Sequence, residues 1–150
     1  MTIEELLQTE GKYVGPTSGV SMLPMLKSGR DSVVIMLKTE RLKPWDVALY
    51  KRGDDYVLHR VIRQTDDGYI IRGDNCYSDE KIKEERVIGV LTEYFKAEKR
   101  VQLDDPKYLR YVKRRIKNYK LRRFFFRIKS KAKNAVKRIL IFLRLKRPKV

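Results

Sequence analysis

The sequence predicts a small, mainly β body of antiparallel strands followed by a basic, α-helical C-terminal tail. Between residues 13 and 96, segments rich in Val, Ile, Tyr and Phe alternate with clusters of turn-forming residues. No stretch there has a helical pattern over ten or more residues, which argues against alternating βα units. The net charge of +17 lies almost entirely beyond Lys107. These observations together indicate one β domain with a tail of different character.

The elements follow in order along the chain. Residues 3–9 are predicted to form a short helix or an extended lead-in. Five strands are expected after them, at 32–37, 46–52, 55–64, 68–73 and 86–95. The clusters "RGDD" and "TDDG", which separate the second, third and fourth of these strands, are short enough to close hairpins.

The sequence Asp104-Asp105-Pro106 marks the expected end of the body, because a residue that precedes proline resists the helical conformation. The predicted catalytic body is therefore 1–106 and the tail is 107–150. The tail has 19 Lys and Arg residues and no acidic residue, whereas the body has 17 basic and 19 acidic residues. Nucleic-acid binding is thus not expected of the nearly neutral body.

The tail has the pattern of a basic amphipathic helix. Its apolar residues recur every three to five positions, at Leu121, Phe124, Ile128, Ala132, Ala135, Ile139 and Phe142. A continuous helix would reach roughly 66 Å at 1.5 Å per residue, so a break is expected. The favoured partner is an anionic membrane surface, near which each basic residue contributes on the order of 1 kcal/mol. The three phenylalanines at 124–126 and the run "ILIFL" (139–143) would insert there. Nucleic acid is the second candidate, and a solvated helix without a partner is the third.

The single cysteine, the N-terminus and the lengths of the apolar runs indicate the cellular compartment and limit the possible chemistry. The single cysteine, Cys76, cannot form an internal disulfide, and packing is its expected role. The N-terminus has no apolar signal-peptide core, and the longest uncharged apolar run, 139–143, is far shorter than the about 20 residues that span a membrane. The expectation is a cytoplasmic protein, peripheral at the membrane. No cluster has metal-ligand spacing, so neither a metal nor another cofactor is expected.

Ser21, in "SGVSMLPML" (18–26), is the candidate nucleophile, although most serines beside glycine are turn residues. A serine hydroxyl needs a base to accept its proton and donors to stabilise the oxyanion. His59, in "YVLHRVI", is the only histidine, and an imidazole with a pKa of about 6.5 can act as a base near pH 7. If 55–64 and 68–73 form a hairpin, Asp74 falls within a few residues of His59 and could orient its ring. The residues alone therefore indicate a Ser-His-Asp set, with a structural role for each residue as the alternative.

Four motifs in order, "SGVSMLPML", "DVALYKRGDD", "YVLHRVI" and "YIIRGDN", resemble the signal peptidase and LexA-type superfamily of serine peptidases over roughly residues 13 to 95. The resemblance implies that Ser21 is the nucleophile. His59 stands where bacterial members carry a lysine base, as in the endoplasmic-reticulum, archaeal and sporulation-type signal peptidases. Their acidic residues correspond to Asp74, the favoured orienting acid, and to Asp79 and Glu80, of which Asp79 is the second choice. Oxyanion donors are expected from the backbone around Gly19, Val20 and Met22.

Two departures from the family pattern shape the predicted function. Arg30 separates Gly29 from Asp31, which are usually adjacent in the family, and no membrane anchor or DNA-binding segment is expected in the residues before Ser21. Cleavage of secretory leaders and self-cleavage of a repressor are therefore disfavoured. The prediction is a serine endopeptidase that cleaves a peptide or protein precursor, such as the leader of a modified peptide. The alternatives are an inactive homologue that binds peptides and a nucleic-acid-binding module that acts through the tail.

Overall fold

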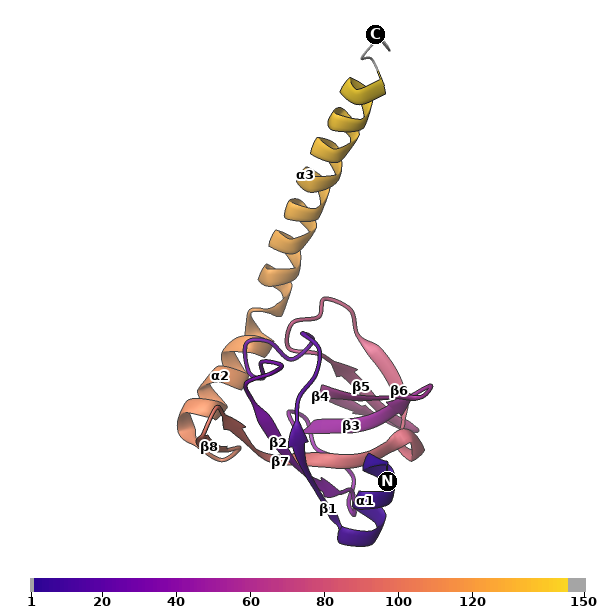
Figure 1. Ribbon diagram of the computed structural model, residues 1–150, viewed down its shortest axis with the longest axis vertical. Helices are drawn as coiled ribbons and strands as arrows, with labels where there is room; N and C mark the ends of the chain where they lie inside the picture. The colour runs from indigo at the N-terminus through magenta and orange to yellow at the C-terminus, as the bar shows by residue number, and fades with distance from the viewer. Residues whose placement is uncertain (1, 146–150) are drawn as a thin grey trace. The chain divides into compact units, whose positions relative to one another are not determined.

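The structure, a computed structural model, describes residues 2–145, with side chains up to residue 141. It divides into two compact units, residues 1–113 and 114–150. The first unit is a mainly antiparallel β body and the chain continues into a C-terminal helix (Figure 1), which confirms the predicted fold class.

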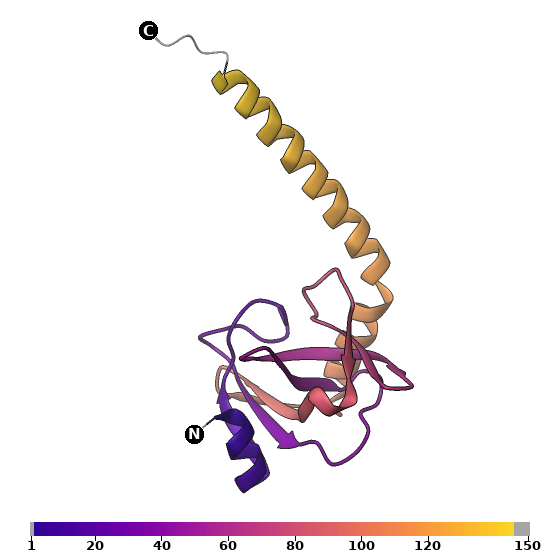
Figure 2. The same ribbon diagram turned by 90° about the vertical axis from the view of Figure 1, so that its right-hand side faces the viewer.

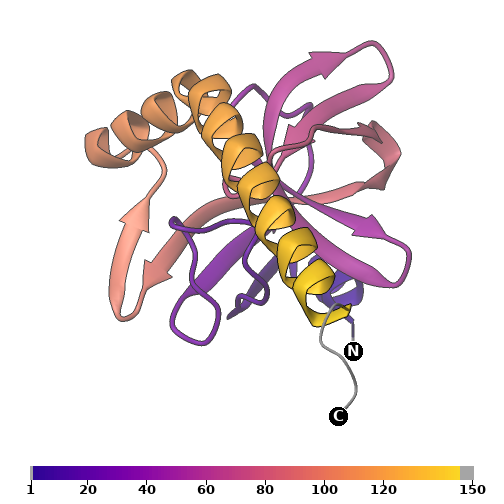
Figure 3. The same cartoon turned by 90° about the horizontal axis from the view of Figure 1, so that it is seen from above.

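One sheet forms the body, and all of its strand pairs are antiparallel. The strands are β1 (Lys12–Pro16), β2 (Ser32–Leu37), β3 (Val47–Arg52), β4 (Asp55–Thr65), β5 (Gly68–Arg72), β6 (Glu80–Lys83), β7 (Val87–Lys96) and β8 (Lys99–Gln102). Their order is β1-β2-β7-β3-β4-β5-β6, and β8 pairs with β7. The sheet curls instead of lying flat (Figures 2 and 3), so that strands distant in sequence enclose a common interior.

The interior holds the apolar side chains of the central strands. One cluster joins β3, β4 and β5 with the loop before β3, through residues that include Leu42, Tyr50, Val61, Tyr69 and Ile71. The two predicted hairpins are present, because β3 pairs with β4 and β4 with β5. The second hairpin contains a bulge: its register shifts by one residue between Val61 and Arg63. This shift changes which residues of β5, and of the loop after it, lie opposite the residues of β4 that precede the bulge.

A short helix, α1 (Ile3–Glu10), precedes the sheet and contacts β1, β2 and β7. Thr2 caps it by accepting a hydrogen bond from the Glu5 amide while the Glu5 side chain accepts one from the Thr2 amide. Gly11 ends the helix with a φ of +67°, a conformation that favours glycine. Leu7 is fully buried and fixes the helix on the sheet.

All five predicted strands are confirmed to within one residue at either end, as β2, β3, β4, β5 and β7. Sequence reasoning missed the other three, β1, β6 and β8. Their sequences, KYVGP, EKIK and KRVQ, are short and have few apolar residues, and the first also contains glycine and proline. They lie at or near the edges of the sheet, where one side of a strand faces solvent and the apolar pattern is weak. A 3-10 turn, η1 (Glu84–Arg86), links β6 to β7.

The C-terminal segment forms two helices, α2 (Pro106–Lys117) and α3 (Tyr119–Leu145), and Asn118 provides the expected break. The body extends further than predicted, because Tyr108 and Val112 of α2 are buried within the unit that ends at Lys113. Residues 107–113 therefore belong to the body and not to the tail. Side chains 123–141 of α3 are all exposed, and the predicted apolar position Phe142 lies beyond the described side chains. No helix in the described range is long and apolar enough to cross a membrane.

Candidate active site

Ser21 lies in a long loop, residues 17–31, between β1 and β2. The loop is anchored from inside by Met22, Met25 and Leu26, which are all buried. Gly19 has a φ of +78°, so the turn that presents Ser21 uses a backbone conformation in which side chains are strained. Ser21 itself is only partly buried and lies at the surface of the loop. The apolar side chains thus fix the loop while the hydroxyl-bearing residue stays accessible.

Asp31 closes the base of this loop. Its carboxylate accepts hydrogen bonds from the amides of Lys27 and Ala97 at 2.8 and 3.1 Å. It also pairs with the Arg30 guanidinium at 2.6 and 2.8 Å, and its carbonyl accepts from the Thr17 amide. The hydrogen bond from Arg30 lowers the pKa of Asp31 to about 2. Arg30 therefore serves as the counter-ion of the carboxylate that holds the loop closed.

His59 is a buried residue of β4, and its Nδ1 atom contacts two polar groups. The Tyr50 hydroxyl and Glu80 Oε1 each lie 3.2 Å from Nδ1. The Tyr50 hydroxyl also donates to Glu80 Oε2 at 3.0 Å. Burial and the nearby Glu80 carboxylate raise the pKa of Tyr50, so its proton is retained at neutral pH. With the tyrosine proton directed to Glu80, Nδ1 of His59 is the donor and Nε2 carries a free lone pair.

Burial lowers the pKa of His59 below its ordinary value of 6.5, and Glu80 opposes this shift only in part. The imidazole is therefore neutral at pH 7. A neutral ring with a free Nε2 lone pair is the form that can accept a proton from a hydroxyl.

Gly73 brings the Ser21 segment and the imidazole together. A methyl group on Gly73 would stand 2.7 Å from the Ser21 carbonyl oxygen and 2.9 Å from His59 Nε2. The backbone of Ser21 and the free nitrogen of His59 thus lie against the same residue, and only glycine leaves room for both. Ser21, His59 and Glu80 line one open cleft of about 660 Å³, together with Gly19, Val20 and Met22.

The loop after β5 holds the Ser21 segment by three hydrogen bonds. The Asn75 amide donates to the Ser21 carbonyl at 2.7 Å, and the Asn75 side chain donates to the Val20 carbonyl at 3.2 Å. The Asp74 amide donates to Met22 Sδ at 3.5 Å. In contrast, the amides of Ser21 and Met22 donate to no protein acceptor within residues 2–145. These two N–H groups, together with the backbone at Gly19 and Val20, remain the candidate oxyanion donors.

The structure changes the assignment of the acidic residue. Asp74 forms a bidentate ion pair with Arg60 at 2.7 and 2.8 Å, and Asp79 pairs with Arg72 at 2.8 Å. Glu80 is the carboxylate that contacts the His59 ring. The bulge in the hairpin between β4 and β5 gives the reason: it pairs Arg60 with Arg72, whereas an unshifted register would bring Asp74 opposite His59.

Sequence reasoning noted Glu80 only as an acid after the Gly-Asp-Asn motif and did not consider Tyr50 as part of the site. Glu80 begins β6, a strand that was not predicted, so its direction could not be inferred. Tyr50 lies in the apolar run of β3 and has the pattern of a core residue. Cys76 also lines the cleft, but burial raises the pKa of its thiol, which keeps it protonated and a poor nucleophile.

No family model matches the chain, and no curated protein matches it. The chemical interpretation of the site therefore depends on the placement of Ser21, His59 and Glu80.

Proposed function

We propose that the protein is a serine endopeptidase with Ser21 as the nucleophile and His59 as the general base. The observation that carries this proposal is the position of His59, whose Nε2 lone pair is free, against Gly73 and the Ser21 backbone. The Ser21 hydroxyl attacks the scissile carbonyl and His59 Nε2 takes its proton. His59 then gives this proton to the leaving amine, and water hydrolyses the acyl-enzyme by the reverse sequence.

In this mechanism Glu80 and Tyr50 act on the opposite side of the imidazole. Glu80 holds the Nδ1–H tautomer and stabilises the imidazolium that forms when Nε2 is protonated. The Tyr50 hydroxyl fixes the carboxylate by its own hydrogen bond. The amides of Ser21 and Met22 would stabilise the oxyanion. The cleft accepts an extended peptide or a protein precursor, and the mechanism uses no cofactor.

The direct test is cleavage of a diverse peptide library, with products identified by mass spectrometry. The wild type is compared with Ser21→Ala and His59→Ala, which we expect to lose at least 1,000-fold in rate. Ser18→Ala is the matched control, because Ser18 lines the same cleft and should retain activity. Equal cleavage by all four proteins would reject the assignment. Absence of cleavage by folded wild-type protein would favour the inactive peptide-binding homologue.

A second test labels the nucleophile without a substrate. A fluorophosphonate reacts with an activated serine hydroxyl, and we expect one adduct, on the peptide that contains Ser21. His59→Ala should abolish this labelling because the hydroxyl then has no base. Labelling of another residue, or equal labelling of the His59→Ala protein, would contradict the proposed pair.

The pH dependence follows from the lowered pKa of His59. Cleavage depends on the neutral imidazole, so the acidic limb of kcat/KM should have its midpoint below pH 6.5. The unfolded chain binds a proton on this histidine more readily than the folded chain does. The free energy of unfolding should therefore decrease as the pH falls from 6.5 to the pKa of the folded state. An acidic limb centred above pH 6.5 would contradict a buried neutral base.

We further propose that α3 binds an anionic membrane surface and keeps the peptidase on the cytoplasmic face. Support comes from the unbroken exposure of side chains 123–141, which combine basic residues with Phe124, Phe125, Phe126 and Ile128. The protein should sediment with phosphatidylglycerol vesicles and not with phosphatidylcholine vesicles. Replacement of Phe124 and Phe125 by serine should weaken this binding about tenfold. Tighter binding to RNA than to the vesicles would favour the nucleic-acid alternative.

A further inference from the structure

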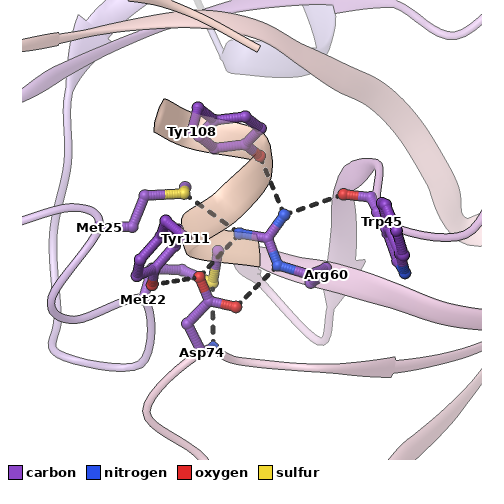
Figure 4. A network of polar contacts seen from close by, with 7 residues as sticks. All are labelled: Met22, Met25, Trp45, Arg60, Asp74, Tyr108 and Tyr111. Carbon is purple, nitrogen blue, oxygen red and sulfur yellow. Dashed lines mark hydrogen bonds and ion pairs between the residues drawn. The ribbon is translucent and has the colours of Figure 1, made fainter. Parts of the chain in front are cut away.

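The first turns of α2 cover a buried polar network below the candidate site. Tyr108 and Val112 are buried, and the ring of Tyr108 packs between Tyr94 and Tyr111 at centroid distances of 6.3 and 6.5 Å. The helix begins at Pro106, so Tyr108 and Tyr111 lie three residues apart on one helical face. Both hydroxyls point into the body from that face (Figure 4).

The two hydroxyls complete the coordination of Arg60 and Asp74. Arg60 donates two hydrogen bonds to Asp74, and its Nη1 donates to the Tyr108 hydroxyl and the Trp45 carbonyl, both at 2.9 Å. Tyr111 donates its hydroxyl proton to Asp74 Oδ2 at 2.8 Å. Both charged side chains are almost fully buried. The attraction within a buried ion pair offsets the cost of its desolvation only when such additional hydrogen bonds satisfy its remaining donors and acceptors.

This network is joined to the candidate catalytic residues on both sides. Arg60 follows His59 directly on β4, so a movement of its side chain strains the strand that carries the base. Asp74 precedes Asn75, whose amide and side chain hold the carbonyls of Ser21 and Val20. The Asp74 amide also contacts Met22 Sδ. The positions of the nucleophile loop and of the base strand therefore both depend on the Arg60–Asp74 pair.

We propose that Tyr111 and Tyr108 are positioning residues, whose hydroxyls fix Asp74 and Arg60 and thereby set the Ser21 segment against His59. This inference rests on the proposed peptidase function, which it deepens by making α2 a part of the catalytic unit. The tyrosines do not line the cleft. Their loss should consequently affect the chemical step and leave substrate binding almost unchanged.

The test uses the full chain with Tyr111→Phe and Tyr108→Phe, each of which removes one hydroxyl and keeps the ring. We expect kcat to fall about tenfold or more, because small displacements of reacting groups have effects of up to 100-fold, while KM stays within twofold. Tyr94→Phe is the matched control. Its ring belongs to the same aromatic cluster, but its hydroxyl has no hydrogen-bond partner among residues 2–145. Val112→Ala controls for a general loss of stability.

A second readout does not require activity. His59 is the only histidine in the chain, so the imidazole gives a single set of NMR signals. We expect these signals to move in Tyr111→Phe and Tyr108→Phe and to stay in place in Tyr94→Phe and Val112→Ala. Unmoved signals in both tyrosine variants, or a loss of kcat equal to that of Val112→Ala, would overturn the proposal. Moved signals in a protein that cleaves no peptide would support the positioning role and reject the peptidase function.

Discussion

His59 and Arg60 are consecutive residues of β4 that face opposite sides of the sheet, and each is paired with a carboxylate. His59 contacts Glu80, which is partly exposed in the cleft. Arg60 contacts Asp74, whose side chain is only 3% exposed. In the proposed mechanism His59 accepts a proton in the cleft beside Glu80, whereas the buried Arg60–Asp74 pair holds the structure. The same strand thus separates a chemical pair from a structural one.

Breaking the structural pair should have the largest effect on stability. Arg60→Met removes the guanidinium and leaves Asp74 buried without its main counter-ion. The free energy of unfolding should decrease by about 3–5 kcal/mol, measured by chemical denaturation. Arg63→Met is the matched control, since Arg63 is exposed on the same strand and its replacement should cost less than about 0.5 kcal/mol. Similar losses in the two variants would show that the buried pair has no special role.

Breaking the chemical pair should affect the rate more than the fold. Glu80→Gln removes the negative charge beside His59. The imidazole can then adopt the Nε2–H tautomer, which cannot accept a proton at Nε2. We expect kcat to fall roughly 100-fold, about 3 kcal/mol in the activation barrier. Asp79→Asn, at the adjacent position, removes a carboxylate that pairs with Arg72 and should leave kcat within twofold. The reverse result would assign the orienting role to Asp79, the second choice from the sequence.

A third carboxylate, Asp31, sharpens the comparison because it is buried like Asp74 but holds the nucleophile loop. Its pKa of about 2 in the folded state lies below the ordinary value of 3.8. It therefore contributes stability above pH 4, on the order of 2 kcal/mol, that is lost as the pH falls from 4 to 2. Asp31→Asn should lower stability at pH 6 and remove this part of the acid dependence. An unchanged pH profile of unfolding would contradict the assigned ion pair.

The smallest effect is expected at Cys76, which lines the cleft and has no chemical role in the proposed mechanism. Cys76→Ser should change kcat and KM less than threefold, because the protonated thiol takes no part in the mechanism. Both constants would be measured with a peptide substrate identified in the cleavage of the peptide library. A loss comparable to that of Ser21→Ala would identify the thiol as the nucleophile and overturn the serine mechanism.

The fold could be predicted for those strands whose burial requires an alternating or continuous apolar pattern in the sequence. The five central strands have that pattern, but the edge strands β1, β6 and β8 do not. In the tail, the apolar spacing predicted helices correctly. It did not distinguish Tyr108 and Val112, which pack on the body, from the exposed positions beyond residue 122. The predicted boundary was placed at Asp104-Asp105-Pro106, which marks where the helix begins and not where its contact with the body ends, so it came too early.

The sequence predicted that Ser21 and His59 lie near each other, but it did not predict which carboxylate contacts His59. Ser21 and His59 could be chosen from residue chemistry and motif order, and both line the same cleft. Which carboxylate lies beside His59 depends on the register of the hairpin between β4 and β5. The residue inserted between Val61 and Arg63 shifts that register by one position and exchanges the faces of the sheet. Bulges have no reliable sequence signal, so Asp74 and Glu80 could be separated only by the structure.

The boundary of the compact body inside α2 has a consequence for how such a chain can diversify. The first turns of α2 are tied to Arg60 and Asp74 by the hydroxyls of Tyr108 and Tyr111, whereas side chains 123–141 of α3 are exposed to solvent. Exchange of the sequence beyond residue 117 would leave these hydrogen bonds in place, so under the proposed function it would change what the tail binds and keep the peptidase chemistry. A junction at Pro106 would instead remove both tyrosines, and with them the hydrogen bonds that their hydroxyls form with Arg60 and Asp74.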